Sequence, residues 1–204
     1  ELVFGLGRSA QILGDPALGD WLERVTFNAA QGARMADGRA ISYLTSDTRL
    51  DATAHRPDSY SLLNGKHGRF KLSPTHDDIA CCCSPNSLRV MPQFVATQWL
   101  RRPDTPGLVA LAYGPSELRT DVAGTAFRIE QETLYPFEDR IRFVVDAASP
   151  TRLVLWLRHP AWARGWQMDG VTGQAQDGWI VVDRHWQGRT IFTLRFEVPV
   201  HAEP

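Results

Sequence analysis

Apolar residues in the first 35 positions recur every three or four residues, which is the spacing of an amphipathic helix. One set precedes a chain break at Gly14-Asp15-Pro16 and consists of Leu2, Val3, Leu6, Ala10 and Leu13. A second set follows the break and consists of Leu18, Trp21, Leu22, Val25, Phe27 and Ala29. The pattern predicts two helices, with Asp15 or Asp20 near the positive N-terminus of the second.

Residues 36–80 are rich in Asp, Ser, Thr, Gly and His and show little periodicity, so they are predicted to form a long loop region. A third helix is predicted to start at the cysteines, because Pro85 and Asn86 suit a first turn and a cap. Its apolar face runs through Leu100. Pro92 falls inside this helix, where proline bends a helix or marks its first turn.

After the turn-forming segment 101–107 the pattern changes to short runs in which apolar and polar residues alternate. The runs are LVALAY, AFRIEQETLY, RIRFVVD, RLVLWLR, WIVVD and TIFTLRFEV. No helical stretch separates them to make the crossovers of a parallel sheet, so an antiparallel β-sandwich is predicted. We therefore expect an α+β protein with two domains, residues 1–102 and 103–204.

The composition limits the partners. The 204 residues are 43% apolar, which is enough for a sizeable core. A formal net charge of −1, with Lys and Arg scattered, offers no basic surface, and no apolar run approaches the roughly 20 residues of a membrane span. The sequence predicts neither a nucleic-acid nor a membrane partner. Three adjacent cysteines cannot close disulfide loops, which favours a reducing compartment such as the cytoplasm.

Three patterns have both a structural and a functional interpretation. The segment Gly5-Leu6-Gly7-Arg8-Ser9-Ala10 matches a weak dinucleotide fingerprint but follows no strand, so close helix packing is favoured. Glu138-Asp139 suits a turn rather than an acid/base pair. Tryptophans in the second half could stack on sugar rings or pack in the core. They are Trp156, Trp162, Trp166, Trp179 and Trp186.

The run Cys81-Cys82-Cys83 is the most informative feature of the chain. Neighbouring thiols where a loop enters a helix can share a metal, and a helix N-terminus stabilises the thiolate that binds zinc or attacks carbon. Burial as three small apolar side chains explains the run equally well. His76, Asp77 and Asp78 could be further ligands, although a solvated loop is the simpler interpretation.

Several ordered motifs are similar to those of the β-L-arabinofuranosidase-like glycoside hydrolases of family 127. Cys82-Cys83-Ser84-Pro85-Asn86 with Arg89 resembles the family signature CC-x-P-N-x-x-R. The other similar segments are Gly14-Asp15-Pro16 with Asp20-Trp21-Leu22-Glu23-Arg24, Thr133-Leu134-Tyr135-Pro136-Phe137, Leu157-Arg158-His159-Pro160-Ala161-Trp162-Ala163 and Arg184-His185-Trp186-Gln187-Gly188. Arg189 stands where the family usually has Asp.

This resemblance implies that residues 1–102 are the last helices of an (α/α)6 toroid and that a β-sandwich follows. It also implies retaining hydrolysis of β-L-arabinofuranosides, or of a related plant sugar, by a zinc-bound cysteine in place of the usual carboxylate. Matched residue by residue, Cys82 is the nucleophile and a Zn²⁺ ligand, Cys83 is a second Zn²⁺ ligand, and Tyr43 lines the substrate pocket. Cys81 is an extra.

The resemblance further implies that the remaining zinc ligands and the general-acid Glu lie upstream of Glu1, in a missing N-terminal part of the catalytic domain. The chain alone is then expected to be inactive. Two other functions remain open. One is a non-catalytic carbohydrate-binding or scaffolding module, and the other is a thiol-based metal or redox sensor built on the three cysteines.

Overall fold

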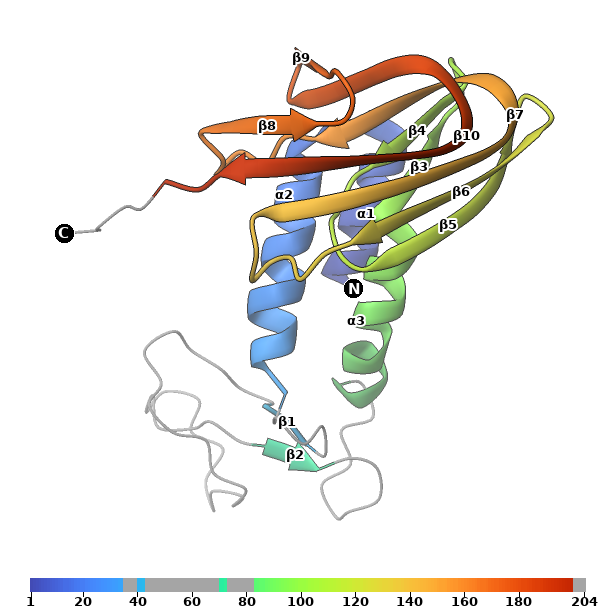
Figure 1. The fold of residues 1–204 in the computed structure, drawn as a ribbon. Helices are drawn as coiled ribbons and strands as arrows, with labels where there is room; N and C mark the ends of the chain where they lie inside the picture. Colours follow the sequence, from blue (N-terminus) through green and yellow to red (C-terminus); the bar gives the residue numbers. More distant parts are fainter. Residues whose placement is uncertain (35–39, 43–69, 73–82, 200–204) are drawn as a thin grey trace, which may run out of the picture.

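The structure, a computed structural model, describes residues 1–34, 40–42, 70–72 and 83–199. Helices α1 (Leu2–Leu13) and α2 (Ala17–Arg24) pack side by side, and α2 continues as the π-helix η1 (Val25–Ala30) (Figure 1). The two predicted helices are therefore confirmed. The break between them is made by Gly14, whose φ of 67° is left-handed and whose N–H bonds the carbonyl of Ala10.

Both acidic residues lie at the start of α2, as predicted: Asp15 precedes the helix and Asp20 lies in its first turn. Oδ1 of Asp15 accepts a hydrogen bond from the backbone N–H of Ala17 at 2.9 Å, which satisfies one of the free donors of the helix N-terminus. Asp20 has a different partner, described below.

Helix α3 (Cys83–Gln98) starts at the cysteines as predicted and contains Pro92. It ends two residues earlier than expected, because Trp99 begins strand β3 (Trp99–Arg102). Helix α1 approaches α3 closely at Gly7, where an added Cβ would lie 2.5 Å from Cγ2 of Thr97. The packing interpretation of this glycine is thus confirmed.

The remaining strands of the larger sheet are β4 (Gly107–Ala110), β5 (Ser116–Val122), β6 (Thr125–Glu132), β7 (Arg140–Arg158), β8 (Gly165–Asp169), β9 (Gln174–Gln176) and β10 (Trp179–Glu197). Strands β7 and β10 have 19 residues each and pair antiparallel along their whole length, with a register shift between Trp186 and Gly188. A separate pair, β1 (Ala40–Ser42) and β2 (Phe70–Leu72), is antiparallel.

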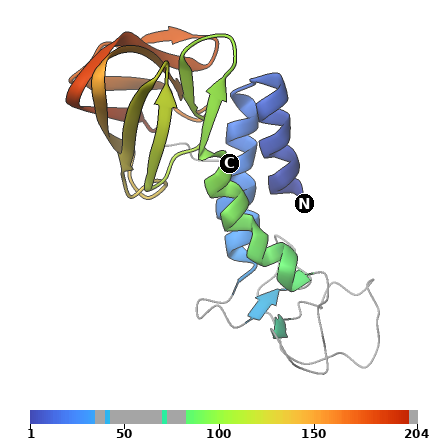
Figure 2. The same ribbon diagram turned by 90° about the vertical axis from the view of Figure 1, so that its right-hand side faces the viewer.

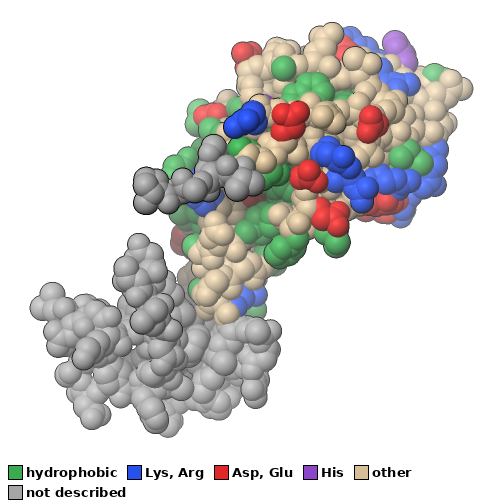
Figure 3. Space-filling view, turned by 60° about the vertical axis from the view of Figure 1, so that its left-hand side comes forward, with side chains coloured by type: hydrophobic (Ala, Val, Ile, Leu, Met, Phe, Trp, Pro, Cys, Tyr) green, Lys and Arg blue, Asp and Glu red, His purple; other side chains and the backbone are tan. Residues whose placement is uncertain are grey.

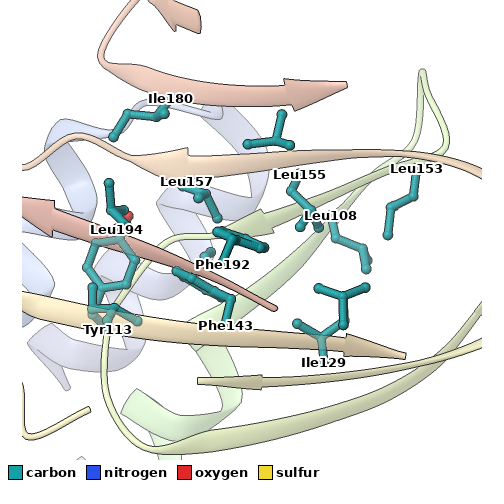
Figure 4. Close-up of a cluster of buried hydrophobic side chains, with 14 of the residues drawn as sticks. Leu108, Tyr113, Ile129, Phe143, Leu153, Leu155, Leu157, Ile180, Phe192 and Leu194 are labelled. Atoms are coloured by element: carbon teal, nitrogen blue, oxygen red, sulfur yellow. The ribbon is translucent and has the colours of Figure 1, made fainter. Parts of the chain in front are cut away.

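The β7–β10 ribbon bends and so forms part of two layers (Figure 2). The first half of β7 pairs with β6 and its second half with β4, while the two halves of β10 pair with β9 and β8. Side chains from both halves meet in one core, as Phe143 and Phe192 do with Leu155 and Ile180 (Figure 4). The sandwich is thus one mixed sheet folded over on itself.

The prediction of a purely antiparallel sandwich was wrong at one strand pair. Strand β4 runs parallel to the second half of β7, with Gly107 opposite Val154 and Ala110 opposite Leu157. The chain between them passes through β5, β6 and the first half of β7, so strands rather than a helix supply the crossover that a parallel pair requires.

The helices cover the outer face of the layer that contains β4. Alternate residues of β4 point to opposite sides, so Leu108 joins the core of the sandwich while Val109 joins a second cluster against the helices. The members of this second cluster are Val3, Ala10, Leu22, Phe94, Val109, Leu111, Ala112 and Trp179. Both faces of β4 are therefore buried, which explains its unbroken apolar sequence.

The expected toroid and the division at residues 102 and 103 stay predictions. Within the described ranges, no helix is long and apolar enough to cross a membrane.

Candidate functional site

The structure places one of the predicted site residues within an element. Cys83 is the first residue of α3. Cys82 directly precedes it and lies outside the described residues, as do Cys81, Tyr43 and the segment 76–78. The helix N-terminus at Cys83 is the feature that the thiolate chemistry requires, because its partial positive charge favours an adjacent anion.

The start of α3 is tied to the end of the helix that contains η1. The Gln31 amide donates to Sδ of Met91 at 3.0 Å, and the Arg34 guanidinium donates to the backbone carbonyl of Ser87. Further from the cysteines in the same interface, the rings of Phe27 and Phe94 meet edge to face with centroids 5.1 Å apart. The first three turns of α3 are therefore held against η1 and the residues that follow it.

The described residues do not by themselves complete a metal site. Among residues 1–34, 40–42, 70–72 and 83–199, no three His, Cys, Asp or Glu side chains come together as a group that could hold an ion. A structural or catalytic zinc site needs at least three protein ligands. Any zinc site at the cysteines must therefore draw on residues outside this set.

A buried charge network joins α2 to the sheet. The Arg158 side chain, which is 0% exposed, forms an ion pair with Glu23 (Nη2 to Oε2, 2.5 Å) and also bonds the carboxylate of Asp20. Its Nε donates to the carbonyl of Leu111 at 2.6 Å. Asp20 and Glu23 both lie on α2, so Arg158 links the helix to the end of β7 and to Leu111, the residue after β4. Asp20, Glu23 and Arg158 belong to the segments that resemble family 127, and in this structure they hold the helices to the sheet.

Two tyrosines complete this network. The Tyr135 hydroxyl donates to Oε2 of Glu23 at 2.5 Å, and the Tyr113 hydroxyl donates to the carbonyl of Arg158. Burial raises the pKa of Tyr113 well above its ordinary value, and burial together with the charge of Glu23 does the same for Tyr135. Burial alone would lower the pKa of Arg158, but the charges of Glu23 and its neighbours raise it. The tyrosines therefore stay protonated as donors while Arg158 stays charged.

Sequence reasoning missed this network, although a signal was present. Arg158 interrupts a run of apolar residues at the end of β7, and Glu23 directly follows the buried Leu22 of α2. A charged residue at a position that the pattern buries requires a partner of opposite charge. Glu138 and Asp139, by contrast, lie in the turn before β7 as predicted.

A cavity of about 730 Å³ opens beside the network, between α2, η1 and the connections β6–β7 and β7–β8. Its lining residues are Asp20, Glu23, Arg24, Phe27, Asn28, Tyr135, Pro136, Phe137, Glu138, Asp139, Ala161, Trp162 and Val198. In the space-filling view, hydrophobic and acidic side chains lie next to one another on the surface between the sheet and the helices (Figure 3). The cavity has the apolar lining and the few polar groups of a small-molecule site.

The tryptophans of the second half divide between the two interpretations. Trp186 is buried and donates its indole N–H to the carbonyl of Leu153 at 2.9 Å, and Trp179 is buried against the helices. Trp156 is half-buried beneath the Arg102 guanidinium, 4.3 Å from the ring centroid. Packing therefore explains these three. Trp162 differs, because it is 40% exposed and lines the cavity.

Comparisons with known proteins agree with the motifs. Residues 107–198 match the family described as Beta-L-arabinofuranosidase, GH127 middle domain. No curated protein sequence matches the chain. A GH127 β-L-arabinofuranosidase from Geobacillus stearothermophilus T6 is similar in structure, with a TM-score of 0.75 and 23% identity over 98% of this chain.

Two further solved structures are similar. One is a GH127 β-arabinofuranosidase with a TM-score of 0.69 and 20% identity over 96% of this chain. The other is described as a glycoside hydrolase and has a TM-score of 0.69 and 20% identity over 94% of this chain. The chain spans 31% of the length of each of these three proteins. Residues 107–198 therefore match the middle domain of the β-L-arabinofuranosidase family GH127, in agreement with the resemblance of the motifs.

Proposed function

We propose that the chain is part of a retaining glycoside hydrolase that acts on β-L-arabinofuranosides or on a related plant sugar. The observation that supports this most is the structural likeness to a GH127 β-L-arabinofuranosidase over 98% of the chain. The likeness extends beyond the matched domain to α1, α2 and α3, so it includes the helix that begins at the cysteines. The toroid, of which these would be the last helices, is part of the same proposal.

In this proposal the thiolate of Cys82 attacks the anomeric carbon of the sugar. A carbon–sulfur bond forms while the bond to the leaving oxygen breaks, and that oxygen takes a proton from an acid outside the described residues. Water then attacks the same carbon and gives a proton to the deprotonated acid, while the carbon–sulfur bond breaks, so the sugar is released and the acid and the thiolate are restored. Two displacements at one carbon retain the configuration.

The helix N-terminus supports this role of Cys82. The first turn of α3 has free N–H groups, and their partial positive charge favours a thiolate over a thiol at the preceding residue. Pro85 lies in this first turn, where its missing N–H removes no helical bond. The sequence around the cysteines thus suits both the start of a helix and an ionised sulfur.

The donor set at the cysteines fits zinc. Thiolates are preferred Zn²⁺ ligands, and Cys82 and Cys83 would supply two of them. The other ligands would come from residues outside those described. When bound, the ion would keep the Cys82 thiol ionised at neutral pH.

Tyr43 is proposed to contact the substrate. Strand β1 ends at Ser42, directly before Tyr43, and β1 contacts α3. The backbone therefore brings the residue before Tyr43 to the helix that begins at Cys83. An aromatic ring there could pack on a sugar ring next to the nucleophile.

Substitution of the cysteines tests the proposal in the whole gene product that contains these 204 residues. Cys82→Ser should abolish hydrolysis of a nitrophenyl β-L-arabinofuranoside and lower the zinc content, because an alcohol replaces the thiolate. Cys81→Ser is the matched control, since Cys81 has no assigned role, and it should retain activity and zinc. Unchanged turnover in Cys82→Ser would overturn the assignment of the nucleophile.

A further inference from the structure

The cavity beside α2 is lined by two exposed aromatic side chains, Trp162 and Phe137, and Trp162 is the one whose ring is stacked on buried neighbours. Trp162 lies in the β7–β8 connection, is 40% exposed and lines the cavity. Its ring stacks on Tyr135, with centroids 6.4 Å apart and planes at 25°, and meets the edge of Phe196 at 5.6 Å. Because Tyr135 and Phe196 are buried, the indole is held in one orientation without a ligand.

The floor of the cavity is fixed by the charge network. Asp20 accepts from Arg158 through Oδ1 and from the backbone N–H of Ala161 through Oδ2 at 3.1 Å. This second bond anchors the residue directly before Trp162 to α2. The position of the indole relative to the helix is therefore set on both sides, by Asp20 at the backbone and by Tyr135 at the ring.

Exposed polar side chains at the rim can bond a ligand. Asn28 and Arg24 are exposed on the helix side, and Glu138 is exposed on the strand side. Glu138 has only a long contact with Arg140, at 3.9 Å. An amide, a guanidinium and a carboxylate around an aromatic face can bond the hydroxyl groups of a sugar while its C–H face packs on the ring.

Two other cavities lined by described residues lack this arrangement. The cavity of about 580 Å³ at the end of α1 includes Trp99, Trp156 and Trp179, but Trp99 packs edge-on against Phe143, Arg102 covers the ring of Trp156, and Trp179 is buried. The cavity of about 560 Å³ beside β5 and β6 has Phe127 as its aromatic residue, and that ring is buried. Of these three cavities, the one beside α2 has exposed aromatic rings.

The distance to the cysteines indicates the size of the ligand. Phe27 lines the cavity and touches Phe94, which lies eleven residues after Cys83 in α3. At the rise of an α-helix, those residues span about 16 Å. A monosaccharide cannot cover that distance, so a ligand that reaches both places must contain several sugar units.

We propose that this cavity is a sugar-binding subsite, in which a unit of an oligosaccharide chain stacks on Trp162 and bonds the rim residues Asn28 and Glu138. The role of the subsite in hydrolysis rests on the proposed function, because a chain bound there would extend towards Cys82. Sugar binding at Trp162 itself does not depend on that chemistry. The subsite needs α2 as well as the sandwich.

The experiment follows the indole N–H signals by NMR while arabinotriose is titrated into the chain with the substitution Cys82→Ser. A Trp162→Phe variant identifies the signal of Trp162. We expect this signal to shift and saturate, while that of buried Trp186 stays in place. Trp162→Ala should weaken arabinotriose binding about tenfold or more, and Trp162→Phe should weaken it less because a ring remains.

The matched control is Trp21→Ala, which removes an exposed tryptophan from α2 that does not line the cavity. It should leave the affinity unchanged. The subsite is overturned if the Trp162 signal does not move, if Trp162→Ala and Trp162→Phe bind like the parent, or if Trp21→Ala loses as much affinity. Binding through Trp162 without hydrolysis by the whole gene product would contradict the proposed function but not the subsite. Hydrolysis without binding through Trp162 would contradict the subsite but not the proposed function.

Discussion

The guanidinium of Arg158 and the carboxylate of Glu23 form an ion pair in which the two side chains are 0% and 6% exposed, with Nη2 and Oε2 2.5 Å apart. One partner ends strand β7 and the other lies in helix α2. The pair therefore joins the helices to the sheet. Glu23 also lines the cavity that Trp162 lines.

Removing one charge of this pair should destabilise the protein strongly. Glu23→Gln keeps the size of the side chain but removes the more deeply buried of the two carboxylates that pair with Arg158. We expect the free energy of unfolding to fall by about 3–5 kcal/mol, as when one partner of a buried ion pair is removed. Urea unfolding, followed by far-UV circular dichroism, measures the change.

Glu138→Gln is the matched control. Glu138 lines the same cavity, but its pairing with Arg140 is exposed and long at 3.9 Å. The same measurement should change by less than about 0.5 kcal/mol, as for other surface substitutions. Equal effects of the two substitutions would show that the buried pair has no special role at this junction.

The two glycines of α1 should respond differently to alanine. In Gly7→Ala the new methyl group would meet Cγ2 of Thr97 at 2.5 Å and push α1 away from α3, which costs about 1–3 kcal/mol. In Gly5→Ala nothing lies within 4 Å, and the higher helix propensity of alanine should stabilise the protein by up to about 1 kcal/mol. Thermal unfolding of the two variants checks this, and a loss of stability in Gly5→Ala would contradict it.

Alkaline pH should destabilise the protein through Tyr113 and Tyr135, whose pKa values are raised in the folded state. Below about pH 10 both the folded and the unfolded chain keep these protons, so the contribution to stability is fully present. Above it the unfolded chain ionises first. Each tyrosine then lowers the free energy of unfolding by about 1.4 kcal/mol per pH unit.

Urea unfolding at several alkaline pH values measures this slope, and tyrosinate absorbance records the ionisation. Tyr135→Phe should reduce the slope, because one of the two groups is removed. It should also lower stability at neutral pH, since Glu23 loses a donor. A native near-UV spectrum that persists while both tyrosines ionise would contradict this prediction, because the folded protein would then not raise the pKa of either tyrosine.

Local patterns predicted the helices well. The spacing of apolar residues and the break at Gly14-Asp15-Pro16 located α1 and α2, and the first-turn residues located the start of α3. Strand pairing depends on contacts that are distant in sequence, and these could not be read in the same way. The runs RIRFVVD and RLVLWLR were predicted as separate strands, but they form one bent strand, β7, which pairs with β6 and β4 at its two ends.

Strand β5 shows a second reason why the sheet could be predicted only in part. Its sequence, SELRTDV, is polar enough to be read as a connection, and only its last residue, Val122, is buried. Such an edge strand is stabilised by its pairing with β6 rather than by burial. The parallel contact of β4 with β7 was missed for another reason: the prediction took a helix to be needed for the crossover, and here β5, β6 and the first half of β7 supply it.

The junction could be predicted only in part. The motifs containing Asp20, Glu23, Tyr135 and Arg158 were found in the sequence, but they were read as markers of a family. Their meeting in one network is a property of the fold, because α2, the β6–β7 connection and the end of β7 are distant in sequence. The side chains proposed for catalysis, Cys82 and Tyr43, lie outside the described residues, so their roles stay predictions.

The most direct test of the proposed function is a search for sugar on Cys82. The whole gene product is mixed with a nitrophenyl β-L-arabinofuranoside, quenched in acid during turnover and digested, and the peptide that contains residues 81–83 is analysed by tandem mass spectrometry. Our account predicts one added pentose on Cys82, and its absence from Cys81 and from the Cys82→Ser variant. Continued hydrolysis with no adduct on Cys82, or an adduct on a carboxylate elsewhere, would contradict it.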